Sequence, residues 1–134
     1  MQNESILALF TKSNIKPTSQ RLVIAKAMLA KPQHLSAEQV LSMVNAEDEL
    51  VSKATVYNTL NLFVEKGLIK QVLIDSSKVF FDSNTGAHGH FYNEDSGELS
   101  DFDPIDINLA GMPALPDNTE QTGVDLIVRI RNSR

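Results

Sequence analysis

Apolar side chains repeat every three or four residues in three segments near the start of the chain, residues 6–10, 22–29 and 40–44. Such spacing places the apolar side chains on one face of a helix. Thr18 can cap the second of these helices, and Ser36-Ala37-Glu38-Gln39 has the spacing of a capping box before the third. The pattern predicts three short amphipathic helices.

A fourth helix is predicted over residues 52–66, with Gly67 closing it, and its two faces differ in chemistry. The apolar stripe follows the spacing i, i+4, i+7, i+8 and consists of Val56, Leu60, Phe63 and Val64. The opposite face carries hydroxyl, amide and phenol groups, from Thr55, Tyr57, Asn58 and Asn61. A solvated helix usually carries Glu and Lys there, whereas these groups suit base edges and phosphates. The pattern indicates a helix that reads DNA.

Alternating and β-branched residues dominate the remaining chain. The runs 68–74 and 78–82 flank a polar turn and predict a hairpin. Helices followed by such a hairpin are typical of a winged helix-turn-helix, in which the helix before the hairpin enters the major groove. The later segments predict a second hairpin, an irregular stretch and a terminal strand, over residues 88–102, 111–122 and 124–130.

The predicted fold class is α+β, with an N-terminal winged helix-turn-helix followed by a small α/β dimerisation domain. We expect the winged-helix DNA-binding domain over residues 1–82, a hinge over 83–87, and a dimerisation and metal-sensing domain over 88–134. The last segment has few apolar side chains for a core of its own, and its terminal strand is β-branched. Pairing of that strand with a second copy would stabilise it, so we predict a homodimer.

Composition narrows the function. The 134 residues include no cysteine, which excludes disulfides and thiolate zinc sites, and no apolar run approaches a membrane span. With no basic segment at Met1–Glu4, we expect a cytoplasmic protein. The net charge is −5, divided as +1 over residues 1–82 (nine basic, eight acidic) and −6 over residues 83–134 (three basic, nine acidic). This asymmetry suits a first part that approaches phosphates and a second that collects cations, although ordinary variation explains it equally well.

Five side chains form a candidate metal site: His34, Asp82, His88, His90 and Asp101. His88 and His90 are two residues apart, so on a strand both point to one face. Imidazole and carboxylate donors without thiolate suit Fe(II), Mn(II) or Zn(II). A polar patch on a strand is the alternative for the His-x-His pair alone. The five residues bracket the expected hinge, so a bound cation would fix the angle between the domains.

Several motifs resemble those of the ferric uptake regulator (Fur) family over nearly the whole chain. They are Lys16-Pro17-Thr18-Ser19-Gln20-Arg21, His34-Leu35-Ser36-Ala37-Glu38 and Ala54-Thr55-Val56-Tyr57. The resemblance implies that the five residues named above form the family's regulatory site for Fe(II) or Mn(II), with Zn(II) as an in vitro substitute. It also implies contacts with DNA from Lys16 in the minor groove and from Tyr57 to bases and backbone.

Within the family, the chain is most similar to the iron response regulator (Irr) branch, on segments 81–85, 90–99 and 123–131. The family's Cys-x-x-Cys pairs for structural zinc are missing, and Asn93 and Ser96 stand where the first pair would be. Where the Irr branch often has three histidines, a proposed haem site, this chain has His88-Gly89-His90. A haem response is therefore left open.

The expected function is a metal-responsive, dimeric transcription regulator of iron homeostasis, a repressor of the Fur type that binds an AT-rich palindromic operator. Its DNA-binding residues would be Lys16, Arg21, Lys53, Thr55, Tyr57, Asn58 and Asn61. We expect no enzymatic activity. The alternatives are a small non-haem iron enzyme with a two-histidine, one-carboxylate site, and a winged-helix interaction module that does not bind DNA.

Overall fold

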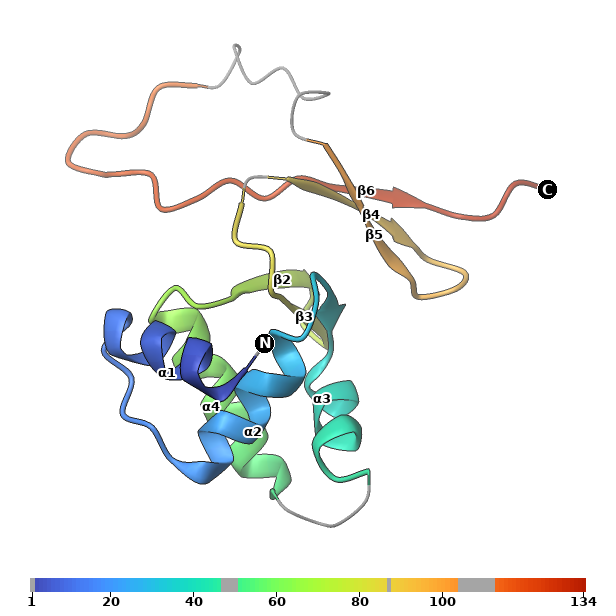
Figure 1. Ribbon diagram of the computed structural model, residues 1–134. Coiled ribbons are helices and arrows are strands. Elements are labelled where there is room, and N and C mark those ends of the chain that lie inside the picture. Colours follow the sequence, from blue (N-terminus) through green and yellow to red (C-terminus); the bar gives the residue numbers. More distant parts are fainter. Residues whose placement is uncertain (1, 47–50, 87, 104–112) are drawn as a thin grey trace. The chain divides into compact units, whose positions relative to one another are not determined.

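The computed structural model describes residues 2–46, 51–86, 88–103 and 113–134 (Figure 1). The chain divides into two compact units, a first unit of Met1–Thr85 and a second unit of Gly86–Arg134. Their boundary falls within the segment predicted as a hinge, of which Ala87 lies outside the described residues. No helix in the described ranges is long and apolar enough to cross a membrane.

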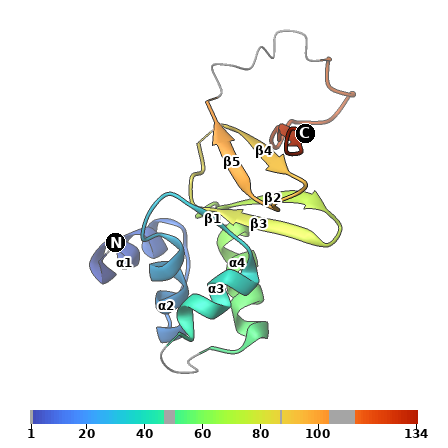
Figure 2. The same ribbon diagram turned by 90° about the vertical axis from the view of Figure 1, so that its right-hand side faces the viewer.

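The described part of the first unit combines helices with a small antiparallel sheet. Its helices are α1 (Asn3–Lys12), α2 (Ser19–Met28), α3 (Ala37–Val44) and α4 (Lys53–Glu65). Its strands, in sheet order, are β1 (His34–Leu35), β3 (Lys78–Asp82) and β2 (Lys70–Asp75). The sheet lies across one end of the helices (Figures 1 and 2). This is the winged helix-turn-helix that the sequence predicts.

The helix ends confirm the predicted capping. The Thr18 side chain accepts a hydrogen bond from the Arg21 amide at 3.1 Å. Ser36 and Gln39 form the reciprocal capping box, with bonds of 3.2 and 2.8 Å. At α4 the cap is Ser52, so the helix proper begins one residue later than the predicted range. These short polar contacts satisfy amides that the first helical turn leaves without partners.

Side chains from all four helices form one hydrophobic core. The Phe10 and Phe63 rings lie 5.6 Å apart between centroids, which places α1 against α4. Val56, Leu60 and Phe63 are buried as predicted, but Val64 is only half-buried. Thr59 is buried in its place, because the side of α4 that faces the core runs through residues 56, 59, 60 and 63. The core therefore fixes which face of α4 points outward.

The first hairpin is confirmed, with β2 and β3 joined by a turn at Asp75–Ser77. Asp75 accepts bonds from the Ser77 hydroxyl and amide, both at 2.8 Å, and these bonds hold the pKa of its carboxyl below the ordinary value. The first strand begins at Lys70 rather than at residue 68. Leu68 instead follows α4 as part of its C-terminal turn, and its amide donates to the Phe63 carbonyl at 2.9 Å.

The described part of the second unit is a three-stranded sheet. Its strands, in sheet order, are β5 (Leu99–Phe102), β4 (Gly89–Asn93) and β6 (Ile127–Ile130). The antiparallel β4–β5 pair confirms the second hairpin. Residues 113–122 are irregular as predicted, and residues 111–112 lie outside the described residues.

The terminal strand is shorter than predicted. It runs parallel to β4 and begins at Ile127 instead of residue 124. The reason is the start of its neighbour: β4 begins at Gly89, and the His90 amide already bonds to the Leu126 carbonyl at 3.0 Å. Residues before Leu126 therefore have no described partner strand alongside them.

Hydrogen bonds connect the β4–β5 turn to Asn132, two residues after β6, and we call this set of bonds the clasp. Asn93 donates from its side-chain amide to Asn132 Oδ1 at 2.9 Å, and the Asn132 amide donates to Asp95 Oδ2 at 2.9 Å. Asn93 also accepts bonds from the amides of Asp95 and Ser96, at 2.9 and 3.1 Å. The positions at which the family resemblance places cysteines thus hold a turn organised by hydrogen bonds.

We expect Asn132→Ala to loosen β6, because it removes the side-chain acceptor for Asn93. Opening of the β4–β6 pair should become easier by about 0.5–1.5 kcal/mol, the usual net value of one hydrogen bond. Hydrogen exchange at the amides of His90 and Glu94, both bonded to the β6 segment, measures this directly. Ser133→Ala is the control. Equal exchange in both variants would contradict the clasp.

Candidate metal centre and nucleic-acid interface

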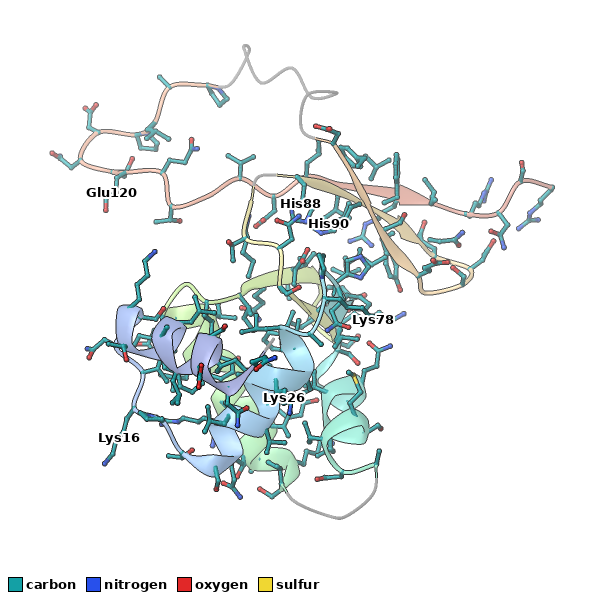
Figure 3. The ribbon with its side chains drawn as sticks, viewed as in Figure 1. Lys16, Lys26, Lys78, His88, His90 and Glu120 are labelled. Atoms are coloured by element: carbon teal, nitrogen blue, oxygen red, sulfur yellow. The ribbon has the colours of Figure 1, made fainter. Side chains whose placement is uncertain are left out.

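The hairpin of the second unit brings two imidazoles and one carboxylate together. His90 on β4 lies opposite Asp101 on β5, so the two side chains share a face of the sheet. Asp101 Oδ1 lies 3.3 Å from His90 Nε2 and 3.7 Å from His88 Nε2, and the two imidazole centroids are 4.5 Å apart (Figure 3). One donor atom from each residue lies within 4.8 Å of the other two. This is the clustering that the His-x-His pattern predicts.

The backbone sets the orientation of one imidazole. His88 Nδ1 lies 2.7 Å from the Gly86 carbonyl, and a carbonyl oxygen only accepts, so Nδ1 carries the proton. In neutral imidazole the other nitrogen is then an acceptor. Nε2, the nitrogen that faces Asp101, is therefore the atom that would bind a cation. Metal-bound histidines commonly have such a hydrogen bond from the second nitrogen.

The cluster is enclosed on the histidine side and open on the carboxylate side. The side chains of His88 and His90 are only 6% and 8% exposed, whereas that of Asp101 is 46% exposed. Two imidazoles and a carboxylate are donors that suit first-row divalent ions, and the chain has no thiolate to compete. The residues present fit a site for Fe(II), Mn(II) or Zn(II).

The other two predicted ligands lie together in the first unit. His34 belongs to the short strand β1, where it pairs directly with Asp82 of β3. Their side chains therefore share one face of the sheet. Asp82 is buried and accepts a hydrogen bond from the Asn84 amide at 2.9 Å. A two-residue strand before a helix cap is too short to detect from periodicity, which explains why β1 was missed.

Gly89 lies between the two histidines, and its lack of a side chain is a packing requirement. The Phe102 ring covers it so closely that an added Cβ would overlap ring atoms. Phe102 also packs against Phe91, with ring centroids 4.8 Å apart. A third histidine at this position, as in the motif of the Irr branch, is incompatible with this placement of Phe102. A haem site built on three consecutive histidines therefore does not fit this chain.

The outward face of α4 presents the predicted DNA-reading residues. Tyr57, Asn58 and Asn61 are exposed. Thr55 is half-buried, and its hydroxyl accepts a bond from Ser52 Oγ at 2.9 Å. Arg21 joins Asn58 and Asn61 in lining an open groove of about 360 Å³ between α2 and α4. Polar groups of α4 are thus collected on one exposed surface, which we call the reading surface and define by Lys53, Tyr57, Asn58 and Asn61.

Two further predicted contacts lie before and within α2. Lys16 is exposed and extends away from the helices in the α1–α2 connection (Figure 3). Its carbonyl accepts a 2.7 Å bond from the Arg21 guanidinium, so Arg21 stabilises the connection that carries Lys16. The side chain of Arg21 and the backbone of Lys16 are therefore held next to each other.

Glu38 was not singled out from the sequence, yet it contacts the reading surface. Its Oε1 lies 2.9 Å from Lys53 Nζ, and the Tyr57 hydroxyl donates to the same oxygen at 3.4 Å. The hydrogen bond from Lys53, together with its charge, holds the pKa of Glu38 below the ordinary value and raises that of Lys53. The residues are separated by 15 and 19 positions in the sequence, so no local spacing could reveal the contact.

Comparison with known proteins agrees with the fold. The model of the ferric uptake regulator family matches residues 12–121, so the chain belongs to that family. The peroxide-responsive repressor PerR of Staphylococcus epidermidis is 29% identical over 99 residues, which cover 74% of this chain and 66% of that repressor.

Solved structures of ferric uptake regulators are similar to this chain over most of its length. The structure of the ferric uptake regulator from Pseudomonas aeruginosa with manganese matches with a TM-score of 0.75 and 27% identity, over 95% of this chain and 97% of that one. The Vibrio cholerae ferric uptake regulator matches with a TM-score of 0.71 and 24% identity, over 93% and 98%, and supports the fold alone.

We expect Gly89→Ala to destabilise the second unit by about 1–3 kcal/mol, because the methyl group must displace the Phe102 ring. Urea unfolding followed by hydrogen exchange at β4 amides gives the value. Gly123→Ala is the control, since an added Cβ there meets no atom within 4 Å. A Gly89→Ala variant as stable as this control would show that Phe102 is not held over residue 89.

Proposed function

We propose that this chain is a dimeric, metal-responsive transcription regulator, in which a divalent cation bound by His88, His90 and Asp101 controls binding to DNA. The observation that carries the proposal is the geometry of this cluster, with an oriented imidazole and a shared carboxylate, immediately after the unit boundary. Membership of the ferric uptake regulator family supports it. The cytoplasm is the compartment that suits such a regulator.

His34 and Asp82 are proposed to complete the metal site. They pair across β1 and β3 and share a face, and the junction between the units follows Asp82 within a few residues. A cation held by donors from both units would restrict the linker and favour one arrangement of the DNA-binding units. Fe(II) or Mn(II) is the proposed ion, with Zn(II) as an in vitro substitute, because the donors are nitrogen and oxygen alone.

The proposed DNA contact is made by α4 in the major groove. Its N-terminal part carries Lys53 and Tyr57, and the following turns carry Asn58 and Asn61. In helix-turn-helix proteins the beginning of this helix contacts base edges. Three further side chains are proposed to contact DNA phosphates or the minor groove: Lys16, Arg21 and Thr55. An AT-rich palindrome is the proposed operator, because a two-fold dimer requires two related half-sites.

The proposed dimer forms through the second unit. Four aliphatic side chains near the C-terminus, Val124, Leu126, Val128 and Ile130, are each 36–39% exposed, and β6 lies at an edge of its sheet. An exposed apolar edge strand favours pairing with another chain. We also propose that this chain belongs to the Irr branch of the family, because it resembles that branch in the segment that contains β6.

We expect Tyr57→Ala to weaken operator binding by about 1–3 kcal/mol, the range for one good base contact. Fluorescence anisotropy with a duplex enriched from a random pool by the Mn(II)-loaded wild type measures the change. Tyr92→Phe, which alters a tyrosine buried in the second unit, is the control. Equal operator affinity for wild type and Tyr57→Ala would remove Tyr57 from the reading surface.

We expect His90→Ala to abolish the effect of Mn(II) on DNA binding, because it removes one imidazole from the cluster. Mn(II) binding by calorimetry and operator binding with and without Mn(II) are the measurements. Glu98→Ala, an exposed carboxylate in the same hairpin, is the control and should respond as wild type does. A normal Mn(II) response in His90→Ala would contradict the assignment of the site.

A further inference from the structure

A carboxylate lies at the reading end of α4, where a DNA-binding surface usually presents positive charge. Glu38, in the first turn of α3, is 2.9 Å from Lys53 Nζ through Oε1. The same oxygen accepts the 3.4 Å bond from the Tyr57 hydroxyl. Lys53 Nζ also lies 5.9 Å from the centroid of the Tyr57 ring. Because Lys53 and Tyr57 are one helical turn apart, a single carboxylate engages both side chains.

We propose that Glu38 is a specificity-determining residue, which masks Lys53 from phosphates of unrelated DNA and holds Tyr57 in its reading orientation. The inference rests on the proposed function, because it requires that α4 enters the major groove. It assigns to an acidic residue of α3 a role in choosing among DNA sequences, in addition to the contacts proposed for α4.

Glu38 masks Lys53 because the two side chains carry opposite charges. Binding to unrelated DNA depends on cations that neutralise phosphates and release counterions. Lys53 paired with Glu38 offers no net charge to a phosphate, and the carboxylate repels one that approaches. Residues 1–82 carry a net charge of only +1, from nine basic and eight acidic side chains with Glu38 included, so exposing one further cation on the reading surface is a large relative change.

The pair is also easy to open. The side chains of Lys53 and Glu38 are 64% and 58% exposed, and ion pairs at that exposure contribute little to stability. A DNA sequence that offers Tyr57 a matching base edge can compensate for opening of the Glu38–Lys53 ion pair, whereas phosphates alone compensate less. The carboxylate stays ionised at neutral pH, since Lys53 lowers the pKa of Glu38.

Glu38→Gln tests the inference, because it removes the charge and keeps the size. The probes are two labelled duplexes, one enriched from a random pool by the Mn(II)-loaded wild type and one with its sequence scrambled, titrated by anisotropy at several salt concentrations. The scrambled duplex should bind about five- to tenfold more tightly near 0.1 M salt, with a salt slope steeper by about 0.9. The enriched duplex should gain less, so the specificity ratio falls.

Two further variants separate masking from other effects. Glu4→Gln makes the same charge change in the first turn of α1, and so controls for net charge and for the helix dipole. In the double variant Glu38→Gln/Lys53→Gln the gain on scrambled DNA should disappear, since no ammonium remains to be unmasked.

A specificity ratio and salt slope for Glu38→Gln equal to those of Glu4→Gln would overturn the inference while leaving the proposed function intact. If the wild type binds neither duplex, the proposed function fails instead, and the inference fails with it.

Discussion

The register between β4 and β5 is the constraint on which the proposed metal centre depends. His90 pairs with Asp101, and His88, one residue before β4, lies close to both side chains. A shift of the register by one residue would send Asp101 to the opposite face and leave the imidazoles without their carboxylate. The turn organised by Asn93 and the Phe102 ring over Gly89 both favour this register.

In the first unit, burial sets the orientation of α4, the helix proposed to read DNA. The core holds the side of α4 that carries Val56, Thr59, Leu60 and Phe63, and the remaining face is left to polar side chains. The reading surface is therefore a consequence of packing. Glu38 modifies that surface from a neighbouring helix, and so couples the position of α3 to the charge that α4 presents.

Local patterns predicted much of this architecture. The capping box at Ser36, the cap at Thr18 and the polar turn of the first hairpin depend on residues close in sequence, and the structure contains each of them. The His-x-His spacing likewise predicted that the two imidazoles lie together, although β4 begins at Gly89 and His88 precedes the strand by one residue. These features needed no knowledge of the tertiary fold.

The features that could not be predicted from the sequence depend on contacts between residues far apart along the chain. The strand at His34 exists because Asp82, far along the chain, pairs with it. The Glu38–Lys53 contact arises where two helices meet, and the late start of β6 depends on where β4 begins. The requirement for glycine at position 89 came from Phe102, on the neighbouring strand. None of these contacts produces a periodic pattern in the sequence, so none could be predicted from residue spacing.

The most direct test of the account is the ligand set of bound Mn(II), measured by pulsed electron paramagnetic resonance on the full chain loaded with one equivalent of the ion. The account predicts strong nitrogen modulation from directly bound imidazole, because His88 and His90 supply their Nε2 atoms to the cation. Modulation from water protons without any imidazole nitrogen would show that the ion binds elsewhere, and would contradict the central claim.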